Sequence, residues 1–272
     1  MKTPNQETPR KKSVLGVGIS ATSYEGVTGL CGRWIRQRRT GAADCPARYI
    51  CVTSVHGVVT AQEDEQFRQV LNRADVATPD GMPLVWALRS FGAERQQRVY
   101  GPTLMLQLCE QAAKDGHRVF LYGGRPETLP LLRARLTERF PALIIAGEYS
   151  PPFRPLTLDE ERLLRERIHN ADPDLIFVGI STPKQEMWMA DHRECFPGVV
   201  MIGVGAAFDF HAGRVKQAPP WMQKIGLEWL FRLLSEPRRL WKRYLLVTPR
   251  FLPGWALQKA GLRKYPAFAD SQ

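Results

Sequence analysis

The feature that most constrains the fold is an alternation of short apolar runs with longer amphipathic segments through residues 14–211. Leu175–Ile180, the clearest apolar run, is rich in β-branched residues and is typical of a strand buried on both faces. Further strands are predicted at Val14–Ser20, Arg48–Thr53, Asp75–Thr78, His117–Tyr122, Ala142–Ala146 and Val199–Gly205. Helices are predicted between them at Ala21–Arg39, Val58–Leu71, Pro83–Arg89, Thr103–Lys114 and Thr157–Asn170. This alternation predicts an α/β fold, a Rossmann-like parallel sheet with helices on both faces.

Length and charge predict one large domain with an appendage. At 272 residues the chain can bury a sizeable core. We expect residues 1–12 to form a disordered basic arm, residues 13–215 the sheet domain, and residues 216–272 a helical C-terminal appendage. The net charge of +11 is concentrated in this appendage, because Trp221 to Tyr265 holds ten Lys or Arg residues against two Glu residues.

The appendage has the composition of a segment that contacts an anionic surface. Four of the seven Trp residues lie among its basic residues. A helix is predicted from Trp221 to Leu233, and Ser235-Glu236-Pro237 is expected to end it and start a second one. In the second helix a basic stripe opposes an aromatic and apolar stripe, which is typical of a basic amphipathic helix in a membrane interface. Nucleic acid, the protein's own sheet or a neighbouring subunit in a homo-oligomer would also fit this pattern.

The cysteine pattern and the N-terminal residues favour a cytoplasmic protein. The five cysteines are odd in number and contain no C-x-x-C pair, which favours reduced thiols over disulfides. Met1 to Lys12 is polar and has no signal-peptide pattern. No run approaches the roughly 18 apolar residues that a membrane-spanning helix needs.

Polar and glycine residues gather at one predicted edge of the sheet, in the loops that follow the strands. These loops contain Thr53, His56, Asp80, Gly81, Gly123, Gly124, Gln185, Glu186 and Asp209. In an open parallel sheet, ligands bind at the carboxyl ends of the strands. Lys184, Gln185 and Glu186 stand in the first turn of a helix, where unpaired backbone N–H groups suit a phosphate. An ordinary loop with a capped helix would give the same pattern, and glycine pairs are often simple turns.

Several common site signatures are missing from the sequence. It contains neither G-x-G-x-x-G nor a P-loop, no Ser in G-x-S-x-G, and no His, Cys and carboxylate group at metal-ligand spacing. Asp172-Pro173-Asp174 matches a D-x-D metal motif, but it precedes its strand and is therefore interpreted as a turn at the opposite edge. His56 and His211 lie next to the site edge, where a lone His is more often structural.

A set of six short motifs occurs in a fixed order along the chain. They are Thr78-Pro79-Asp80-Gly81, Arg98-Val99-Tyr100-Gly101, Pro183-Lys184-Gln185-Glu186, Phe208-Asp209-Phe210 with Ala212-Gly213, Ala218-Pro219 with Trp221, and Glu228-Trp229-Leu230-Phe231-Arg232 with Glu236-Pro237-Arg238-Arg239. With these motifs the chain resembles the WecG/TagA/CpsF family of bacterial glycosyltransferases, over roughly Val14 to Tyr244. Among its members, the chain is most similar to the exopolysaccharide-linked kind.

The resemblance implies transfer of a sugar from a UDP-sugar to a polyprenyl-diphosphate-linked saccharide at the cytoplasmic face of the membrane. It implies inversion, with no cofactor and no required metal. Residues 13–215 would be the catalytic domain, and residues 216–272 would bind the membrane and close the site. By this resemblance Asp80 would be the general base. Thr53, Arg98 and Gln185 would hold the nucleotide-sugar, and Asp209 would line the same pocket. Arg232, Arg239 and Lys242 or Arg243 would close over the diphosphate.

Two positions depart from the family pattern, and other readings stay open. Val55 stands where many relatives have Asn, and Gln217 where Arg is usual, which leaves Lys216 as the nearest cation. From the residues alone, Asp80 could also cap the helix that Pro83 opens. The alternative function is a nucleic-acid-binding module that uses the basic, Trp-rich appendage. A nicotinamide-dependent oxidoreductase is disfavoured by the missing glycine fingerprint.

Overall fold

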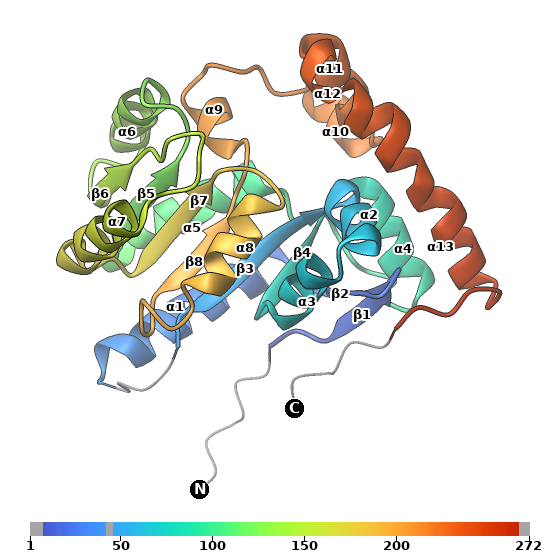
Figure 1. Ribbon diagram of the computed structural model, residues 1–272, viewed down its shortest axis with the longest axis horizontal. Coiled ribbons are helices and arrows are strands. Elements are labelled where there is room, and N and C mark those ends of the chain that lie inside the picture. Colours follow the sequence, from blue (N-terminus) through green and yellow to red (C-terminus); the bar gives the residue numbers. More distant parts are fainter. Residues whose placement is uncertain (1–7, 42–45, 267–272) are drawn as a thin grey trace, which may run out of the picture.

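The computed structural model describes residues 8–41 and 46–266. Its centre is a sheet of six parallel strands in the order β4-β3-β8-β7-β5-β6 (Figure 1). The strands are β3 (Arg48–Ser54), β4 (Val76–Asp80), β5 (Arg118–Gly123), β6 (Ile144–Tyr149), β7 (Leu175–Gly179) and β8 (Val200–Gly203). This arrangement confirms the predicted Rossmann-like fold.

Helices cover both faces of the sheet and enclose a separate apolar core on each. One core lies under α1 (Tyr24–Arg39), α5 (Gly101–Asp115), α6 (Thr128–Arg139) and α9 (Ala207–His211). The other lies under α2 (Val55–Glu63), α3 (Glu65–Arg73), α4 (Met82–Ser90), α7 (Leu158–Ala171) and α8 (Lys184–Asp191). Successive residues of β7 enter opposite cores, Ile176 the second and Phe177 the first. Because both faces are buried, β7 has the continuous apolar sequence that predicted it.

The predicted strand Val14–Ser20 is confirmed over Val17–Ser20, but this segment belongs to a hairpin outside the main sheet. β1 (Lys11–Val14) pairs antiparallel with β2 (Val17–Ser20). The chain reverses at Leu15 and Gly16, whose φ angles of 51° and 78° suit a two-residue hairpin turn. Of the predicted N-terminal arm, residues 1–7 lie outside the described residues, while Lys11 and Lys12 belong to β1.

The predicted helix Val58–Leu71 is two helices, α2 and α3, that meet at Asp64. The backbone of Asp64 is extended, with φ −130° and ψ 101°, so it ends α2. Its carboxylate accepts a hydrogen bond from the backbone N–H of Phe67 at 2.9 Å, so it also caps α3. The break at Asp64 was not predicted, because the helical spacing of apolar residues continues across it.

The D-x-D segment lies at the amino edge of the sheet, as predicted. Asp172 has a left-handed backbone and ends α7. The Asp174 carboxylate is buried and accepts hydrogen bonds from the Arg118 backbone N–H at 2.8 Å and from the Arg39 guanidinium at 2.6 Å. These contacts fix the entry into β5 and β7, so the segment is structural.

The C-terminal residues 220–259, here called the tail, form a chain of helices along one side of the molecule (Figure 1). They are α10 (Pro220–Lys224), α11 (Glu228–Ser235), α12 (Pro237–Trp241), the π-helix η1 (Lys242–Val247), the 3₁₀-helix η2 (Thr248–Arg250) and α13 (Phe251–Lys259). The predicted single helix from Trp221 to Leu233 is wrong, because Gly226 adopts a φ of 78° and ends the first turn early. The predicted restart at Pro237 is confirmed.

Specific contacts fix the far end of the tail to residues 8–41 and 46–219, here called the sheet region. Phe251 is buried in the core beside the β1–β2 hairpin. The Gln258 side chain accepts a hydrogen bond from the Leu15 backbone N–H at 2.8 Å and donates one to the Ser13 carbonyl at 2.9 Å. The Trp255 indole donates to Ser90 Oγ at 3.0 Å. Within the described part of the chain, no helix is both long and apolar enough to cross a membrane.

Candidate functional site

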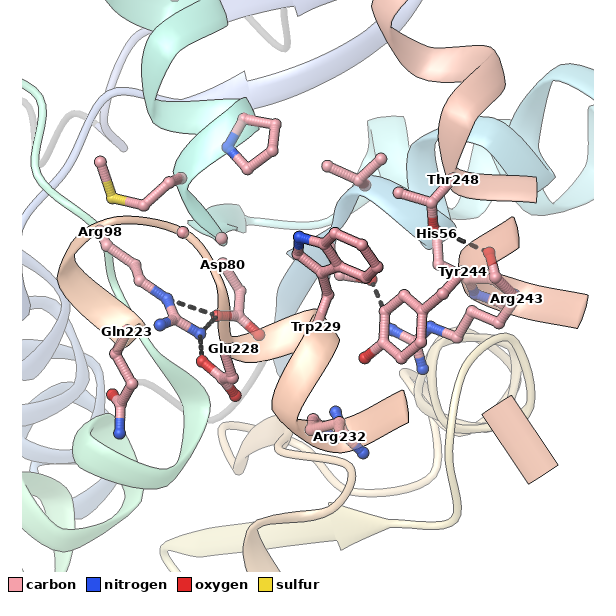
Figure 2. Close-up of a pocket in the computed structure, with 16 residues that line it drawn as sticks. His56, Asp80, Arg98, Gln223, Glu228, Trp229, Arg232, Arg243, Tyr244 and Thr248 are labelled. Atoms are coloured by element: carbon pink, nitrogen blue, oxygen red, sulfur yellow. Dashed lines mark hydrogen bonds and ion pairs between the residues drawn. The ribbon is translucent and has the colours of Figure 1, made fainter. Parts of the chain in front are cut away.

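A pocket lies at the carboxyl ends of β3 and β4, between the sheet and the tail (Figure 2). The sheet region contributes Ser54, Val55, His56, Asp80, Gly81, Met82, Pro83 and Arg98. The tail contributes Gln223, Gly226, Glu228, Trp229, Arg232, Arg243, Tyr244 and Thr248. The cavity volume is about 110 Å³, well below the roughly 300–1,000 Å³ usual for small-molecule sites. The tail therefore occupies much of the space above this edge of the sheet.

Asp80, Arg98 and Glu228 form an ion-paired group in this pocket (Figure 2). Asp80 is the last residue of β4, so the parallel sheet presents its carboxylate at the site edge. Arg98 Nε and Nη2 both donate to Asp80 Oδ1, at 3.1 and 2.9 Å. Arg98 Nη2 also lies 2.7 Å from Glu228 Oε2. The guanidinium stands 4.0 Å from the centre of the Tyr100 ring, which fixes its plane.

The carboxylate of Asp80 is free to act because it does not cap a helix. α4 begins after Gly81, whose φ is 110°, and no side chain caps it. Burial raises the pKa of Asp80 above its ordinary value, and the charge of Glu228 raises it further, whereas Arg98 and Arg232 lower it. A partly buried carboxylate that also accepts hydrogen bonds from one cation is suited to take a proton from a bound hydroxyl.

Arg243 and His56 form a second group on the other side of Trp229 in Figure 2. Arg243 Nη2 donates to Ser54 Oγ at 3.2 Å, while its Nε is buried without a hydrogen-bond partner. Burial lowers the pKa of Arg243. Burial, and then the charge of Arg243, lower the pKa of His56 to about 4, so its ring is neutral near pH 7.

Arg232 completes a cluster of positive charge over the pocket. Its guanidinium stands 5.5 Å from the centre of the Phe210 ring, and its Nε is buried without a hydrogen-bond partner. Among the residues that the structure describes, neither Arg232 nor Arg243 forms an ion pair with a carboxylate. Buried donors without partners are costly, so these two arginines are suited to bind an anion in the pocket.

Gln185 and Glu186 do not line this pocket but lie buried beneath the site edge. The Gln185 side chain accepts a hydrogen bond from the Gly205 backbone N–H at 3.0 Å and donates to Glu186 Oε1 at 2.9 Å. Thr182 Oγ1 also donates to Glu186 Oε1, at 2.9 Å, while Glu186 Oε2 has no partner. Burial raises the pKa of Glu186. These contacts join the loop after β7 to the loop after β8.

The remaining predicted site residues also lie outside the pocket lining. Thr53 is buried, and its hydroxyl donates to the Cys51 carbonyl at 3.2 Å. A Cβ on Gly123 would lie 2.6 Å from the Gly179 backbone, so this glycine permits close packing of strand ends, and Gly124 donates to the Gly179 carbonyl at 3.0 Å. Asp209 Oδ1 accepts from Thr128 Oγ1 at 3.3 Å. Arg239 pairs with Glu236 at 2.6 Å on the tail surface.

The structure also brings in residues that were not predicted for the site. Glu228, Trp229 and Tyr244 all come from the tail, more than 140 residues after Asp80 in the chain. Two signals were available in the sequence: Glu228 and Trp229 belong to the last of the six ordered motifs, and Glu228 is one of only two acidic residues in a basic segment. Within the described residues, no group of three His, Cys, Asp or Glu side chains is arranged to hold a metal ion.

The parallel sheet and a pocket of carboxylates and arginines at its carboxyl edge define a Rossmann-like α/β enzyme architecture. The sequence model of the glycosyl transferase WecG/TagA/CpsF family matches residues 12–265. The chain therefore belongs to this glycosyltransferase family, as its ordered motifs predicted. The match spans the sheet, the hairpin and the tail, so both walls of the pocket lie within it. The chain is thus a transferase of cell-surface polysaccharide synthesis.

Proposed function

We propose that the protein is an inverting, metal-independent glycosyltransferase that moves a sugar from a UDP-sugar to a polyprenyl-diphosphate-linked saccharide. Its product would enter exopolysaccharide or another cell-surface polysaccharide. The observation that carries this proposal is that Asp80, at the end of β4, lines the same pocket as Arg232 and Arg243 of the tail, which form no ion pair with a carboxylate among the described residues. The pocket thus offers a base on one wall and positive charge on the other.

In the proposed reaction Asp80 takes the proton from a hydroxyl of the acceptor saccharide. The hydroxyl oxygen forms a bond to the anomeric carbon of the donor sugar while the bond from that carbon to the UDP oxygen breaks. One displacement from the opposite side inverts the anomeric configuration. A positioned base contributes on the order of 10²–10⁴ in rate. Arg232 and Arg243 stabilise the negative charge that develops on the departing diphosphate.

The residues beneath the pocket support this chemistry by fixing its walls. Gln185 and Glu186 hold the loops after β7 and β8 together, and the buried Glu186 Oε2 is an acceptor without a partner. We place the nucleoside end of the donor over these loops, next to Asp209 and the Gly123-Gly124 turn. Gly81, with a φ of 110°, lets the chain turn sharply beside the reacting carboxylate.

The tail is proposed to bind the anionic inner surface of the cell membrane, because large apolar side chains remain exposed beside its basic residues. The exposed side chains are Trp221, Ile225, Trp229, Leu234, Trp241, Leu245, Leu246, Leu252 and Leu257. Such a mixture suits an interface where apolar groups enter the lipid and cations meet its headgroups. A second copy of the chain could cover the same side chains, which would give a homo-oligomer in solution.

The test uses the purified full chain with polyprenyl-diphosphate-linked saccharides and a panel of UDP-sugars. We expect UDP release that requires the acceptor, continues in a chelator, and gives a product with the anomeric configuration opposite to that of the donor. No release with any donor and acceptor would contradict the proposal, and loss of activity in the chelator would contradict metal independence. Tight, steeply salt-dependent binding to DNA or RNA without transfer would favour the nucleic-acid-binding alternative.

A further inference from the structure

Glu228 is the carboxylate that the tail contributes to the pocket, and the proposed reaction assigns it no role. It is the first residue of α11, and its side chain is only 12% exposed. Glu236, the other acidic residue of the tail, pairs with Arg239 outside the pocket lining. Burial of a carboxylate is costly unless it is paired. Glu228 meets this condition by pairing with Arg98, so its partner is the same residue that pairs with Asp80.

One nitrogen of Arg98 bridges two carboxylates from distant parts of the chain. Arg98 Nη2 lies 2.9 Å from Asp80 Oδ1 and 2.7 Å from Glu228 Oε2 (Figure 2). Asp80 and Arg98 belong to the sheet region, so they can form their pair without the tail. Glu228 is on α11 of the tail, so its contact with Arg98 depends on how the tail packs against the sheet region. The docked state then places two negative charges around a single positive one, and like charges this close favour protonation of a carboxylate.

We infer that Glu228 is a positioning residue that makes the basicity of Asp80 depend on docking of the tail. When the tail is undocked, Arg98 pairs with Asp80 alone, and its charge keeps the pKa of Asp80 low, so that Asp80 is a weak base. With the tail docked, Glu228 takes part of the charge of Arg98 and adds its own negative charge beside Asp80. The base then becomes strong at the moment when Arg232 and Arg243 are in place over the leaving group. This inference rests on the proposed function, because it gives the tail a part in the same reaction.

The electrostatic surroundings of Asp80 support this coupling. Burial raises the pKa of Asp80, and the charge of Glu228, which comes from the tail, raises it as well. The same docking brings Arg232, which lowers the pKa of Asp80 less than Arg98 does. Coupling the base to docking would limit proton transfer to complexes in which the tail closes the site.

The first experiment measures Asp80 itself and does not need activity. The full chain is labelled with ¹³C at the Asp carboxyl carbons, and the Asp80→Asn variant identifies the Asp80 resonance. In Glu228→Gln we expect the midpoint of the Asp80 titration to fall by roughly one pH unit. Glu236→Gln is the matched control, because it removes the other acidic charge of the tail, and it should leave the midpoint unchanged. An unchanged midpoint in Glu228→Gln, or equal shifts in both variants, would overturn the inference.

A second variant separates the electrostatic role from simple attachment of the tail. Hydrogen exchange at the amides of α11 and α12 shows whether Glu228→Gln leaves the tail docked. Glu228→Asp keeps the charge with a shorter side chain, and we expect it to restore most of the wild-type midpoint. If Glu228→Asp titrates like Glu228→Gln while its amides remain protected, charge at this position does not control Asp80 and the inference fails.

The kinetic counterpart is the pH profile of sugar transfer. We expect kcat of Glu228→Gln to fall about three- to tenfold near pH 7, because a weaker base accepts the proton less readily. The donor KM should change less than twofold, and the acid limb of the kcat profile should move to lower pH, since Asp80 would then stay ionised longer. A large rise in KM with an unmoved acid limb would show a binding role instead. If the wild type transfers no sugar, the proposed function fails, whereas the carboxyl titration still decides the role of Glu228.

Discussion

The sheet region buries its large apolar residues, whereas the tail leaves most of its own exposed or only partly buried. In the sheet, residues such as Ile176, Phe177 and Ile202 are fully buried between two layers of helices. In the tail, α10 and α11 contain no fully buried residue, and Leu234 is 73% exposed. The sheet region therefore supplies most of the buried apolar area that stabilises the fold. The tail buries only Leu240 and Phe251 among its large apolar side chains, and polar contacts such as Glu228 with Arg98 and Gln258 with the β1–β2 hairpin attach it to the sheet region.

The sheet region therefore contributes most to the stability of the fold, whereas the candidate site depends on both regions. The pocket needs both regions, because Asp80 and Arg98 come from the sheet region and Arg232 and Arg243 come from the tail. A segment with little core of its own can be displaced at small cost and can meet another surface with its exposed side chains. The buried sheet cannot move or meet another surface in this way, but it holds the carboxylate of Asp80 in a fixed position.

The largest effect expected is loss of transfer in Asp80→Asn. The variant keeps the shape of the side chain but removes the proton acceptor, so the transfer rate should fall by on the order of 10²–10⁴. The measurement is UDP release under saturating donor and acceptor, with circular dichroism to check the fold. Near-normal transfer in a folded variant would exclude Asp80 as the base.

A pair of truncations compares the two regions directly. Phe177→Ala removes a fully buried ring from β7 and should lower the free energy of unfolding by about 3–5 kcal/mol. Leu234→Ala, in the exposed part of the tail, should change it by less than about 0.5 kcal/mol. Urea unfolding of both variants tests this contrast. Similar losses in the two variants would mean that the tail is as much a part of the core as the sheet.

Membrane contact should depend on apolar side chains of the tail. The double variant Trp241→Ala/Leu245→Ala should lower binding to anionic vesicles by roughly tenfold or more, because each side chain loses apolar area that the lipid would cover. Sedimentation with phosphatidylglycerol vesicles measures this. Leu158→Ala is the control, because Leu158 is 91% exposed on α7 and lies outside the tail.

Two outcomes of the vesicle experiment would contradict the membrane role. One is unchanged sedimentation of the double variant with lipid. The other is a lower molecular mass of the double variant than of the wild type in solution without lipid, which would show that a second copy of the chain covers Trp241 and Leu245.

A further effect is expected on the pH dependence of stability. The pKa of His56 is about 4 in the folded protein against an ordinary value of 6.5. Between these values the unfolded chain binds the proton and the folded protein does not, so the free energy of unfolding decreases as pH falls from about 6.5 to 4. His56→Gln should make this decrease shallower in urea unfolding measured at several pH values. An identical slope would show that His56 titrates normally.

The sequence predicted the sheet and its site edge well because those features follow from local patterns. The continuous apolar run of β7 and the loops after each strand placed Asp80 and His56 at the same edge. The hairpin of β1 and β2 was missed because a positive φ at Leu15 has no strong signal in a non-glycine residue. The break at Gly226 was missed because the i,i+4 apolar spacing continues through it.

The sequence by itself determined that this chain forms a parallel α/β sheet, belongs to its glycosyltransferase family, and carries a basic appendage. Periodicity, glycine and proline positions and ordered motifs are properties of neighbouring residues, so they can be read along the chain. Only the tertiary structure decided that Glu228 shares Arg98 with Asp80, and that Gln185 and Glu186 lie beneath the pocket. Such pairings depend on how distant segments pack, and charge interactions depend on the burial that this packing creates.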